Sequence, residues 1–334
     1  MSGIKSDKEI KRKTKSFRSR KKNVGNTPCI KTNVLGAELG IDNIYLKFEG
    51  LNPTGTQKDR IAKYCIEDAI IYGKENITVG SCGNYGVAIS YMASKADIKA
   101  HICVPKEFTG KRISCMEEYG ANIIRIPGKY EASVEESKRL AHKNKWYDAN
   151  PGGQNTVLGM LGYINIANEL ISEIETPDTI SVALGNGTTL AGIHLGYRIK
   201  WREKELLRMP HMLGGSTSSN PICVTYNLGK KKIIELDPYS IEETEVNEPL
   251  INWRSYDGQY ALDAIYDSHG ATYSFFDDEL IEYAKLIKKS EGINVLPASC
   301  AALGALIKYL DGKGNKKSLT KPHVVVITGK GEDG

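Results

Sequence analysis

The feature that most constrains this chain is a strict alternation of short β-branched runs with longer amphipathic stretches. The runs IYLKFEG (44–50) and NITVGS (76–81) have the length and residue types of buried strands. Each is followed, after a short loop, by a stretch with helical spacing of its apolar residues, at 56–73 and 83–97. Because strands and helices in such alternation form parallel sheets with right-handed crossovers, the predicted fold class is α/β.

Length and composition favour two lobes within this α/β fold. A chain of 334 residues with 40% hydrophobic content can bury one large core or two modest ones, and two is the more common outcome. Such folds bind ligands in a cleft beyond the carboxyl ends of the strands. The stretch 202–277 is predicted to be irregular. Further strands are predicted at 100–105, 122–128, 179–185 and 323–329, and further helices at 109–120, 131–144, 157–174, 189–201, 278–290 and 298–310.

Charge and cysteine content limit the class of protein. The 45 Lys and Arg against 40 Asp and Glu give a net charge of +5, which is too small a bias to indicate a nucleic-acid partner. The seven cysteines form no C-x-x-C pair, so we expect reduced thiols, no metal site and a cytoplasmic location. The first residues lack the apolar core of a signal peptide, and no apolar run is long enough to span a membrane.

The N-terminal segment 1–23 is strongly basic, with ten Lys or Arg between residues 5 and 22. It is either an arm that binds RNA or another anionic surface, or a solvated or frayed segment that precedes the fold. Aromatic residues do not alternate with the basic ones as they do in many RNA-binding segments, so the second interpretation is favoured and no chemistry is assigned to this arm.

Three glycine-bearing loops directly follow predicted strands, and two of them open helices. In VGSCGNYGVA (79–88) and ALGNGTTLAG (183–192), backbone N–H groups at a helix N-terminus could receive a carboxylate or a phosphate. The second loop is neither a Walker A motif nor a dinucleotide-binding motif, because no G-K-[ST] follows and Leu190 replaces the third glycine. The third loop, VVITGKGEDG, ends the chain and brings Thr328 just past a strand.

Lys58, in KFEGLNPTGTQKDR (47–60), opens a predicted helix, where the helix dipole disfavours a cation. Either it is a tolerated surface residue, or its amine is uncharged for part of the time. A lysine that readily loses its proton, in a cleft beside a phosphate-binding loop, is typical of Schiff-base chemistry.

The segment NPTGTQKDR resembles the lysine segment N-P-T-G-S-x-K-D-R of pyridoxal-phosphate enzymes of the tryptophan-synthase β-like superfamily (fold type II). Further segments resemble that family in the same order from about residue 24 to residue 331. They are GNTPCI, SCGNYGVAISYMA, GANIIRIPG, GNGTTLAG, LPASCAALGAL and VVVITGKG. The last two resemble the threonine-synthase branch.

The resemblance implies a role for each matching residue. Lys58 would form the Schiff base with pyridoxal 5′-phosphate and move protons between carbons of the substrate, and Asn84 would bind the 3′-oxygen of the cofactor. Thr328 would meet the pyridine nitrogen, with Ser299 and Cys300 as rivals. A neutral hydroxyl there favours elimination and replacement over transamination. The loop for the substrate carboxylate would be Ser81, Cys82, Gly83, Asn84 and Tyr85, and that for the cofactor phosphate Gly185, Asn186, Gly187, Thr188 and Thr189.

Three departures bear on the substrate. Leu296 replaces a glutamate, Lys330 replaces a histidine that is common in the branch, and GYIN (162–165) lacks the lysine expected near a phosphorylated substrate. We expect a threonine-synthase-like lyase that acts on a small amino acid, with phosphohomoserine slightly ahead of any other substrate. The cations that could bind its phosphate are Lys111, Arg112, Arg125 and Lys330. The alternatives are a serine or threonine ammonia-lyase, a β-replacement synthase, and a binding protein on the same fold without catalysis.

The resemblance also implies a domain organisation. We expect a large cofactor domain of residues 24–59 and 151–334 and a small α/β domain of residues 60–150, after the basic arm 1–23. A homodimer is usual for such folds. A partner other than a small amino acid, such as a membrane or a nucleic acid, is not expected.

Overall fold

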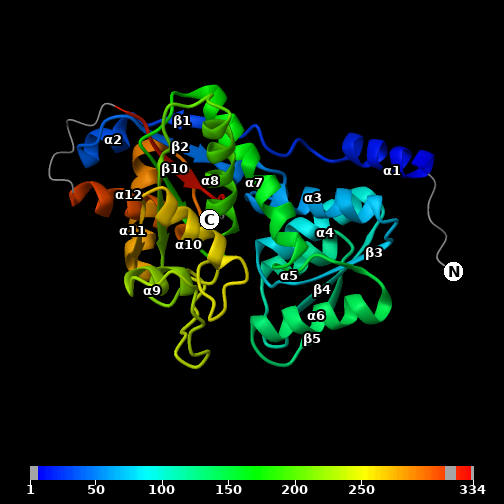
Figure 1. Ribbon diagram of the computed structural model, residues 1–334. Coiled ribbons are helices and arrows are strands. Elements are labelled where there is room, and N and C mark those ends of the chain that lie inside the picture. The colour runs from blue at the N-terminus through cyan, green and yellow to red at the C-terminus, as the bar shows by residue number, and fades with distance from the viewer. Residues whose placement is uncertain (1–6, 313–320, 332–334) are drawn as a thin grey trace. The chain divides into compact units, whose positions relative to one another are not determined.

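The structure is a computed structural model that describes residues 7–312 and 321–331 (Figure 1). The chain divides into two compact units. Unit 1 contains the chain up to Val24, then Asn52–Thr54 and Lys58–Leu158, and unit 2 contains the remainder. The chain therefore changes unit on both sides of the three residues that precede Lys58.

Unit 1 is built on a four-stranded parallel sheet in the order β5-β4-β3-β6. Ile77, Val79 and Ile102 are fully buried, as the β-branched runs predict. The strands are β3 (Asn76–Gly80), β4 (Lys99–Pro105), β5 (Asn122–Ile126) and β6 (Tyr147–Asp148). The helices are α1 (Asp7–Arg20), α3 (Lys58–Ile71), α4 (Asn84–Ala96), α5 (Lys111–Glu118) and α6 (Tyr130–Asn144).

The described part of the basic arm is attached to the rest of unit 1. Residues 7–20 form helix α1, which contacts α3 and α4 and buries Phe17 completely. Arg18 pairs with Glu67 at 3.1 Å, and Arg20 pairs with Asp97 at 2.6 Å. All residues of α1 except Phe17 are exposed or half-buried, but the segment is not frayed, because one buried aromatic side chain and two ion pairs attach the helix to unit 1.

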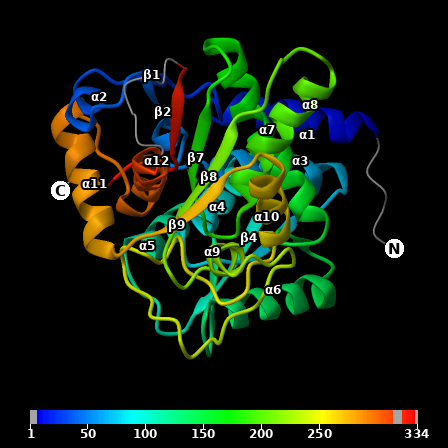
Figure 2. The ribbon, with the colours of Figure 1, turned by 60° about the vertical axis from the view of Figure 1, so that its left-hand side comes forward.

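Unit 2 is built on a six-stranded sheet in the order β1-β2-β10-β7-β8-β9, in which only the β1–β2 pair is antiparallel (Figure 2). All five residues of β10 are buried, which is typical of a central parallel strand covered on both faces. The strands are β1 (Cys29–Lys31), β2 (Ile44–Phe48), β7 (Thr179–Ala183), β8 (His211–Ser216), β9 (Ala271–Ser274) and β10 (His323–Ile327).

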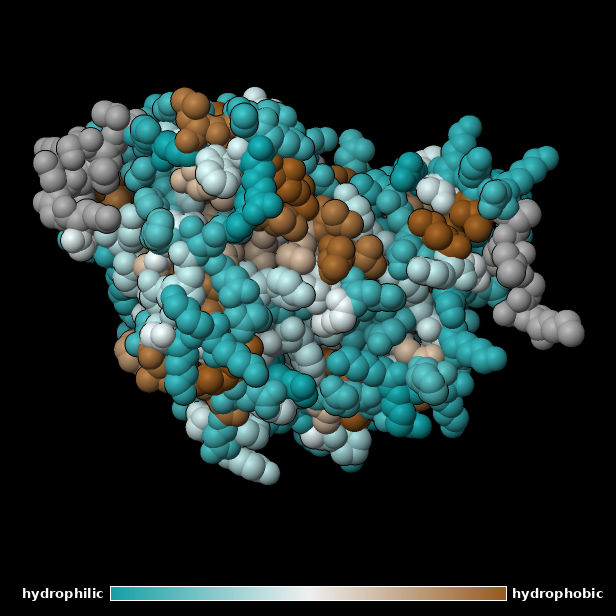
Figure 3. Space-filling model, in the orientation of Figure 1, coloured by the Kyte–Doolittle hydropathy of each residue, from teal (hydrophilic) through white to brown (hydrophobic). Residues whose placement is uncertain are grey.

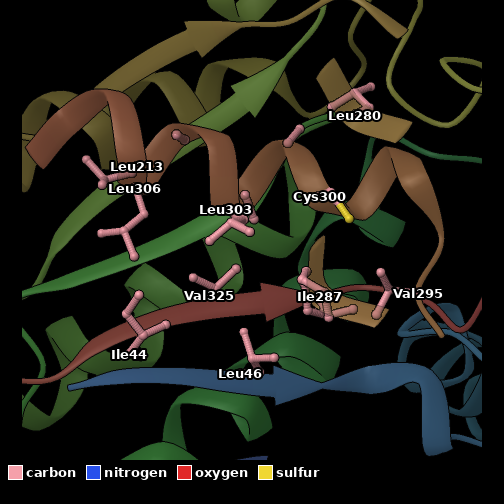
Figure 4. Close-up of a cluster of buried hydrophobic side chains, with 14 of the residues drawn as sticks. Ile44, Leu46, Leu213, Leu280, Ile287, Val295, Cys300, Leu303, Leu306 and Val325 are labelled. Carbon is pink, nitrogen blue, oxygen red and sulfur yellow. The ribbon is translucent and has the colours of Figure 1, made fainter. Parts of the chain in front are cut away.

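The core of unit 2 lies between this sheet and α12 (Ala301–Asp311). Figure 4 shows Leu303 and Leu306 of α12 directed toward Val325 of β10, with Ile44 of β2 beside them. The remaining helices are α2 (Val34–Leu39), α8 (Thr188–Arg202), α9 (Pro221–Asn227), α10 (Gly258–Asp267) and α11 (Asp277–Glu291), with 3₁₀ turns at Glu49–Leu51 and Pro297–Cys300. Helix α7 (Gln154–Glu173) begins in unit 1 and ends in unit 2.

The α/β fold class with parallel sheets is confirmed. The stretch 202–277 is more regular than predicted, because β8, α9, α10 and β9 lie within it. Its longest part without a helix or strand runs from Leu228 to Asp257. Among the described residues no helix has the length and hydropathy needed to cross a membrane.

Candidate active site

Lys58 is the first residue of α3, and its side chain is half-buried. The residues just before it are attached to the end of β10: Gln57 N donates to the Thr328 carbonyl at 2.9 Å, and Thr56 pairs with Gly329. Gly55 turns the chain with a φ of +83°, which favours glycine. Lys58 therefore lies one peptide bond from a residue that is hydrogen-bonded to Thr328.

The start of α3 tolerates a cation because an acid follows it. Asp59 is fully buried, and its Oδ2 accepts hydrogen bonds from Thr54 N at 2.8 Å and Thr54 Oγ1 at 3.0 Å. A carboxylate in the first turn is stabilised by the helix dipole that disfavours the neighbouring lysine. The hydrogen bonds between Asp59 and Thr54 thus hold the backbone next to Lys58 in place.

The loop after β3 opens α4 without a side-chain cap. Gly83 is the N-cap in extended conformation, and the N–H groups at the start of α4 have no acceptor within the helix. The Asn84 amide has no hydrogen-bond partner among the residues that the structure describes. The Tyr85 hydroxyl, in contrast, donates to the Ala149 carbonyl at 2.8 Å and lies 3.4 Å from Cys65 Sγ. Any contact of Tyr85 with a carboxylate must therefore come from its backbone.

The remaining residues of this loop, Ser81 to Gly83, are held by local hydrogen bonds and burial. Ser81 Oγ accepts from Gly86 N at 3.1 Å, and Ser81 N donates to the Cys103 carbonyl at 3.0 Å. Cys82 is buried, and Gly83 is half-buried. These contacts attach the loop to β4 and to the first turn of α4.

The glycine loop after β7 occupies residues 184–189 and leads into α8. Gly187 is the N-cap of α8 with a φ of +86°, and a methyl group there would lie 2.6 Å from Ala261 and 2.8 Å from Ile222. A methyl group at Gly185 would lie 2.6 Å from the Pro249 carbonyl oxygen. Both glycines are therefore required by packing, before any ligand is considered.

The two threonines of this loop have different partners. Thr188 Oγ1 donates to the buried carboxylate of Asp257 at 2.6 Å. The hydroxyl of Thr189, which is 7% exposed, has no hydrogen-bond partner among the described residues. Only the second hydroxyl is available to a ligand.

Thr328 and the two alternative residues, Ser299 and Cys300, are all buried in unit 2, but their side chains differ in the hydrogen bonds that they make. Ser299 Oγ donates to the Leu296 carbonyl at 2.6 Å, and Cys300 Sγ approaches the same oxygen at 3.8 Å. Burial also raises the pKa of the Cys300 thiol well above its usual range. In the described part of the chain the Thr328 hydroxyl has no partner, so it is the best donor of the three.

Unit 2 brings several of these groups to one edge of its sheet. Strands β10 and β7 are parallel neighbours with Val326 opposite Val182, so Thr328 and Gly185 both follow the carboxyl ends of adjacent strands. This edge is where α/β sheets bind ligands. The loop 81–85 follows β3 in the same way within unit 1.

The four basic residues predicted to bind a substrate phosphate lie in different structural environments. Lys111 and Arg112 lie in the first turn of α5. Arg125 Nη1 donates to the carbonyls of Lys106 and Phe108, which fixes the loop before α5. The Lys330 side chain is exposed. Among the described residues no group of three or more His, Cys, Asp or Glu is arranged to hold a metal ion.

Sequence reasoning missed the residues that surround the glycine loop. Asn220, Ser255 and Asp257 all contact residues 184–188, although they are separated from them by 35 to 69 positions in the chain. Only the Asn-Pro pair at 220–221, which predicts a helix start, gives a signal in the sequence.

Within unit 2, the glycine loop at the start of α8 and the Thr328 hydroxyl together offer backbone N–H groups and a hydroxyl donor at one edge of the sheet. The chain belongs to the pyridoxal-phosphate dependent enzyme family, whose model matches residues 21–329. Its cofactor is therefore pyridoxal 5′-phosphate, and it is an enzyme of fold type II.

Among characterised proteins the chain is similar to threonine synthases. It is 30% identical to the threonine synthase of Methanocaldococcus jannaschii over 292 residues, which cover 86% of this chain and 70% of that protein. It is 26% identical to the threonine synthase of Mycobacterium tuberculosis over 321 residues, or 92% of this chain and 81% of that protein.

Solved structures confirm the fold. Serine racemase from Dictyostelium discoideum matches with a TM-score of 0.75 and 20% identity over 99% of this chain and 100% of that one. Threonine deaminase isoform 2 from Solanum lycopersicum matches with a TM-score of 0.77 and 14% identity over 98% and 91%.

Proposed function

We propose that this enzyme is a threonine-synthase-like lyase that converts a small amino acid by elimination and replacement. The observation that supports the site most directly is the bond from Gln57 N to the Thr328 carbonyl, which joins the backbone before Lys58 to the residue proposed for the pyridine nitrogen. The similarity to threonine synthases supports the branch, and phosphohomoserine is the first substrate to test.

Lys58 and Thr328 have the central roles in this proposal. When bound, the cofactor withdraws electron density from the Cα of the amino acid. Lys58 would hold the cofactor through Nζ and, once released, the same Nζ would take and return protons at Cα and the neighbouring carbons. The Thr328 hydroxyl would donate to the pyridine nitrogen without charging it, which favours elimination and replacement over transamination.

The two loops would bind the remaining groups. In unit 1, Asn84 would donate its amide to the 3′-oxygen, and the loop Ser81–Tyr85 would hold the substrate carboxylate through backbone N–H groups other than that of Ser81, which donates to the Cys103 carbonyl. In unit 2, the N–H groups of 185–189 and the Thr189 hydroxyl would bind the cofactor phosphate, while Thr188 supports the loop through Asp257. The dipoles of α4 and α8 favour anions at both places.

We expect Lys58→Ala to accept pyridoxal phosphate through the glycine loop yet to form no reducible lysine adduct. Borohydride reduction followed by peptide mapping checks this, with Lys63→Ala in the same helix as the matched control. A label on a lysine other than Lys58 in the unaltered enzyme would refute the assignment.

The substrate is the second point to test. A phosphorylated substrate brings a dianion into the site, and burying it requires paired cations. The candidates are Lys111, Arg112, Arg125 and Lys330, of which Arg125 also donates to two backbone carbonyls. Release of phosphate and formation of threonine from phosphohomoserine would support the branch.

One observation favours an alternative. The segment 162–165 has no lysine and Leu296 replaces an acid. The site therefore lacks a cation that a phosphorylated substrate would need, whereas an unphosphorylated substrate does not require it. Release of ammonia from serine or threonine, without turnover of phosphohomoserine, would identify an ammonia-lyase. A β-replacement synthase would instead consume an activated serine together with a nucleophile.

The proposal includes the organisation of the molecule. Residues 24–59 and 151–334 would form the cofactor domain and residues 60–150 the small domain. We also propose a homodimer, because Leu161, Ile199 and Trp201 of unit 2 are 41%, 39% and 45% exposed and Figure 3 shows hydrophobic patches on a largely hydrophilic face. Seven free cysteines support a cytoplasmic location.

A further inference from the structure

The connection between α9 and α10 has no helix or strand from Leu228 to Asp257, yet its last residues pack against the glycine loop (Figure 2). Tyr256 N donates to Asn186 Oδ1 at 3.1 Å, and Ser255 Oγ donates to the Asn186 carbonyl at 3.2 Å. Long connections without regular structure are uncommon in compact domains and often have a function.

Asn220 joins this connection to the glycine loop. Its side chain is fully buried, and Nδ2 lies 2.8 Å from the Leu250 carbonyl, 3.1 Å from that of Gly185 and 3.2 Å from that of Leu184. Its Oδ1 accepts from Ile222 N at 3.0 Å and caps α9. One amide thus contacts three separate segments of unit 2.

These contacts fix the direction of three successive peptide groups. In a trans peptide the C=O and the following N–H point in opposite directions. Because the carbonyls of Leu184 and Gly185 face Asn220, the next two N–H groups face away from it. Because the Asn186 carbonyl faces Ser255, the Gly187 N–H faces away from that hydroxyl. None of the N–H groups of residues 185–187 has an acceptor among the described residues.

We infer that Asn220 and Ser255 are positioning residues for the cofactor phosphate. They hold the three carbonyls on one side of the loop and thereby aim the N–H groups of Gly185, Asn186 and Gly187 at a phosphate on the other side. Neither side chain touches the phosphate. The inference rests on the proposed cofactor site and is independent of the amino-acid substrate.

Asn220→Asp tests this role with little change of shape. Aspartate keeps the oxygen that caps α9 but replaces the donor with an acceptor, so the Gly185 carbonyl loses its donor, while the Leu184 carbonyl keeps Ser216 Oγ at 2.7 Å. We expect cofactor affinity, measured by spectroscopic titration, to fall tenfold or more. In ³¹P spectra, the bound phosphate resonance should move toward that of free cofactor, a change that mere loss of stability would not produce.

Asn247→Asp is the matched control. Asn247 is also buried in the same connection and its Oδ1 also caps a turn, at 2.9 Å from Thr244 N, but it makes no contact with residues 184–189. The new charge there should change cofactor affinity less than twofold. Ser255→Ala introduces no charge and should lower cofactor affinity about threefold, which keeps the inference testable if Asn220→Asp fails to fold.

Thr189→Val separates the two possible failures, because its hydroxyl is proposed to bind the phosphate directly, whereas Gly187 is already required by packing. If Thr189→Val lowers cofactor affinity while Asn220→Asp and Ser255→Ala behave like the control, the positioning role is overturned and the phosphate site stands. If all three variants leave cofactor affinity unchanged, the phosphate binds elsewhere and the proposed site itself fails.

Discussion

Thr188 and Thr189 are adjacent and chemically identical, but the structure gives them different tasks. Thr188 donates to the buried Asp257, whereas the Thr189 hydroxyl has no hydrogen-bond partner among the described residues, and we propose that it binds the cofactor phosphate. We expect Thr189→Val to lower cofactor affinity about tenfold, because a hydrogen bond to a charged group contributes about 1.5–3 kcal/mol.

Thr188→Val should act on stability instead. It leaves a buried carboxylate without this donor, so the free energy of unfolding should fall by about 1–3 kcal/mol, as measured by urea denaturation. An equal loss of cofactor affinity in both variants would contradict the division of tasks.

The sequence could predict this loop but not the difference between its threonines. Its glycines and hydroxyls after a strand are a local pattern, and Lys58 and Asn84 are found in the same way. Asp257, in contrast, is 69 positions from Thr188, and the chain between them contains three elements and an irregular connection. Contacts over such separations depend on how the sheet is assembled, which no local pattern records.

At the scale of elements, Lys47 connects β2 to α7 through buried ion pairs. Its side chain is fully buried, with Nζ 2.9 Å from Glu169 Oε2, 3.3 Å from Glu173 Oε1 and 2.5 Å from the Thr27 carbonyl. Removing one partner of a buried ion pair leaves the other charges uncompensated. Lys47→Ala should therefore lower the free energy of unfolding by about 3–5 kcal/mol.

Lys285→Ala is the control for this prediction. Lys285 pairs with Glu282 at 2.7 Å, but both side chains are more than two-thirds exposed, so its loss should have almost no effect on unfolding. Similar denaturation midpoints for the two variants would show that Lys47 does not fasten these elements.

Elements with strong periodicity were predictable, and those without it were not. The apolar strand β10 and the helix α12 follow from residue type and spacing. Strand β8, HMLGGS, has two glycines and no β-branched residue, so its strand state comes from pairing with β7 and β9 on either side. The attachment of helix α1 to unit 1 was not predictable, because a single buried Phe17 gives no periodic pattern.

For the whole molecule, the reactivity of the buried cysteine thiols reports how often the native structure opens. Burial raises the pKa of Cys65 and of Cys223 to about 12 and that of Cys103 to about 11. A raised pKa means less thiolate at a given pH, about one part in a thousand or less at pH 8. These three residues should resist iodoacetamide in the native protein and react in denaturant, as measured by mass spectrometry. Rapid modification of Cys65 in the native protein would indicate frequent opening of unit 1.

The position of β10 between β2 and β7 has a consequence for synthesis on the ribosome. The sheet of unit 1 is complete once residue 148 has emerged, whereas β2, at residues 44–48, has β1 beside it but receives its second neighbour only at residues 323–327. At typical elongation rates this delay is roughly 15–55 s. During that time nascent β2 exposes Leu46 and other side chains that are buried in the finished protein. Unit 1 can fold on the translating ribosome, but the cofactor edge of unit 2 forms only after the strand that completes it has been made.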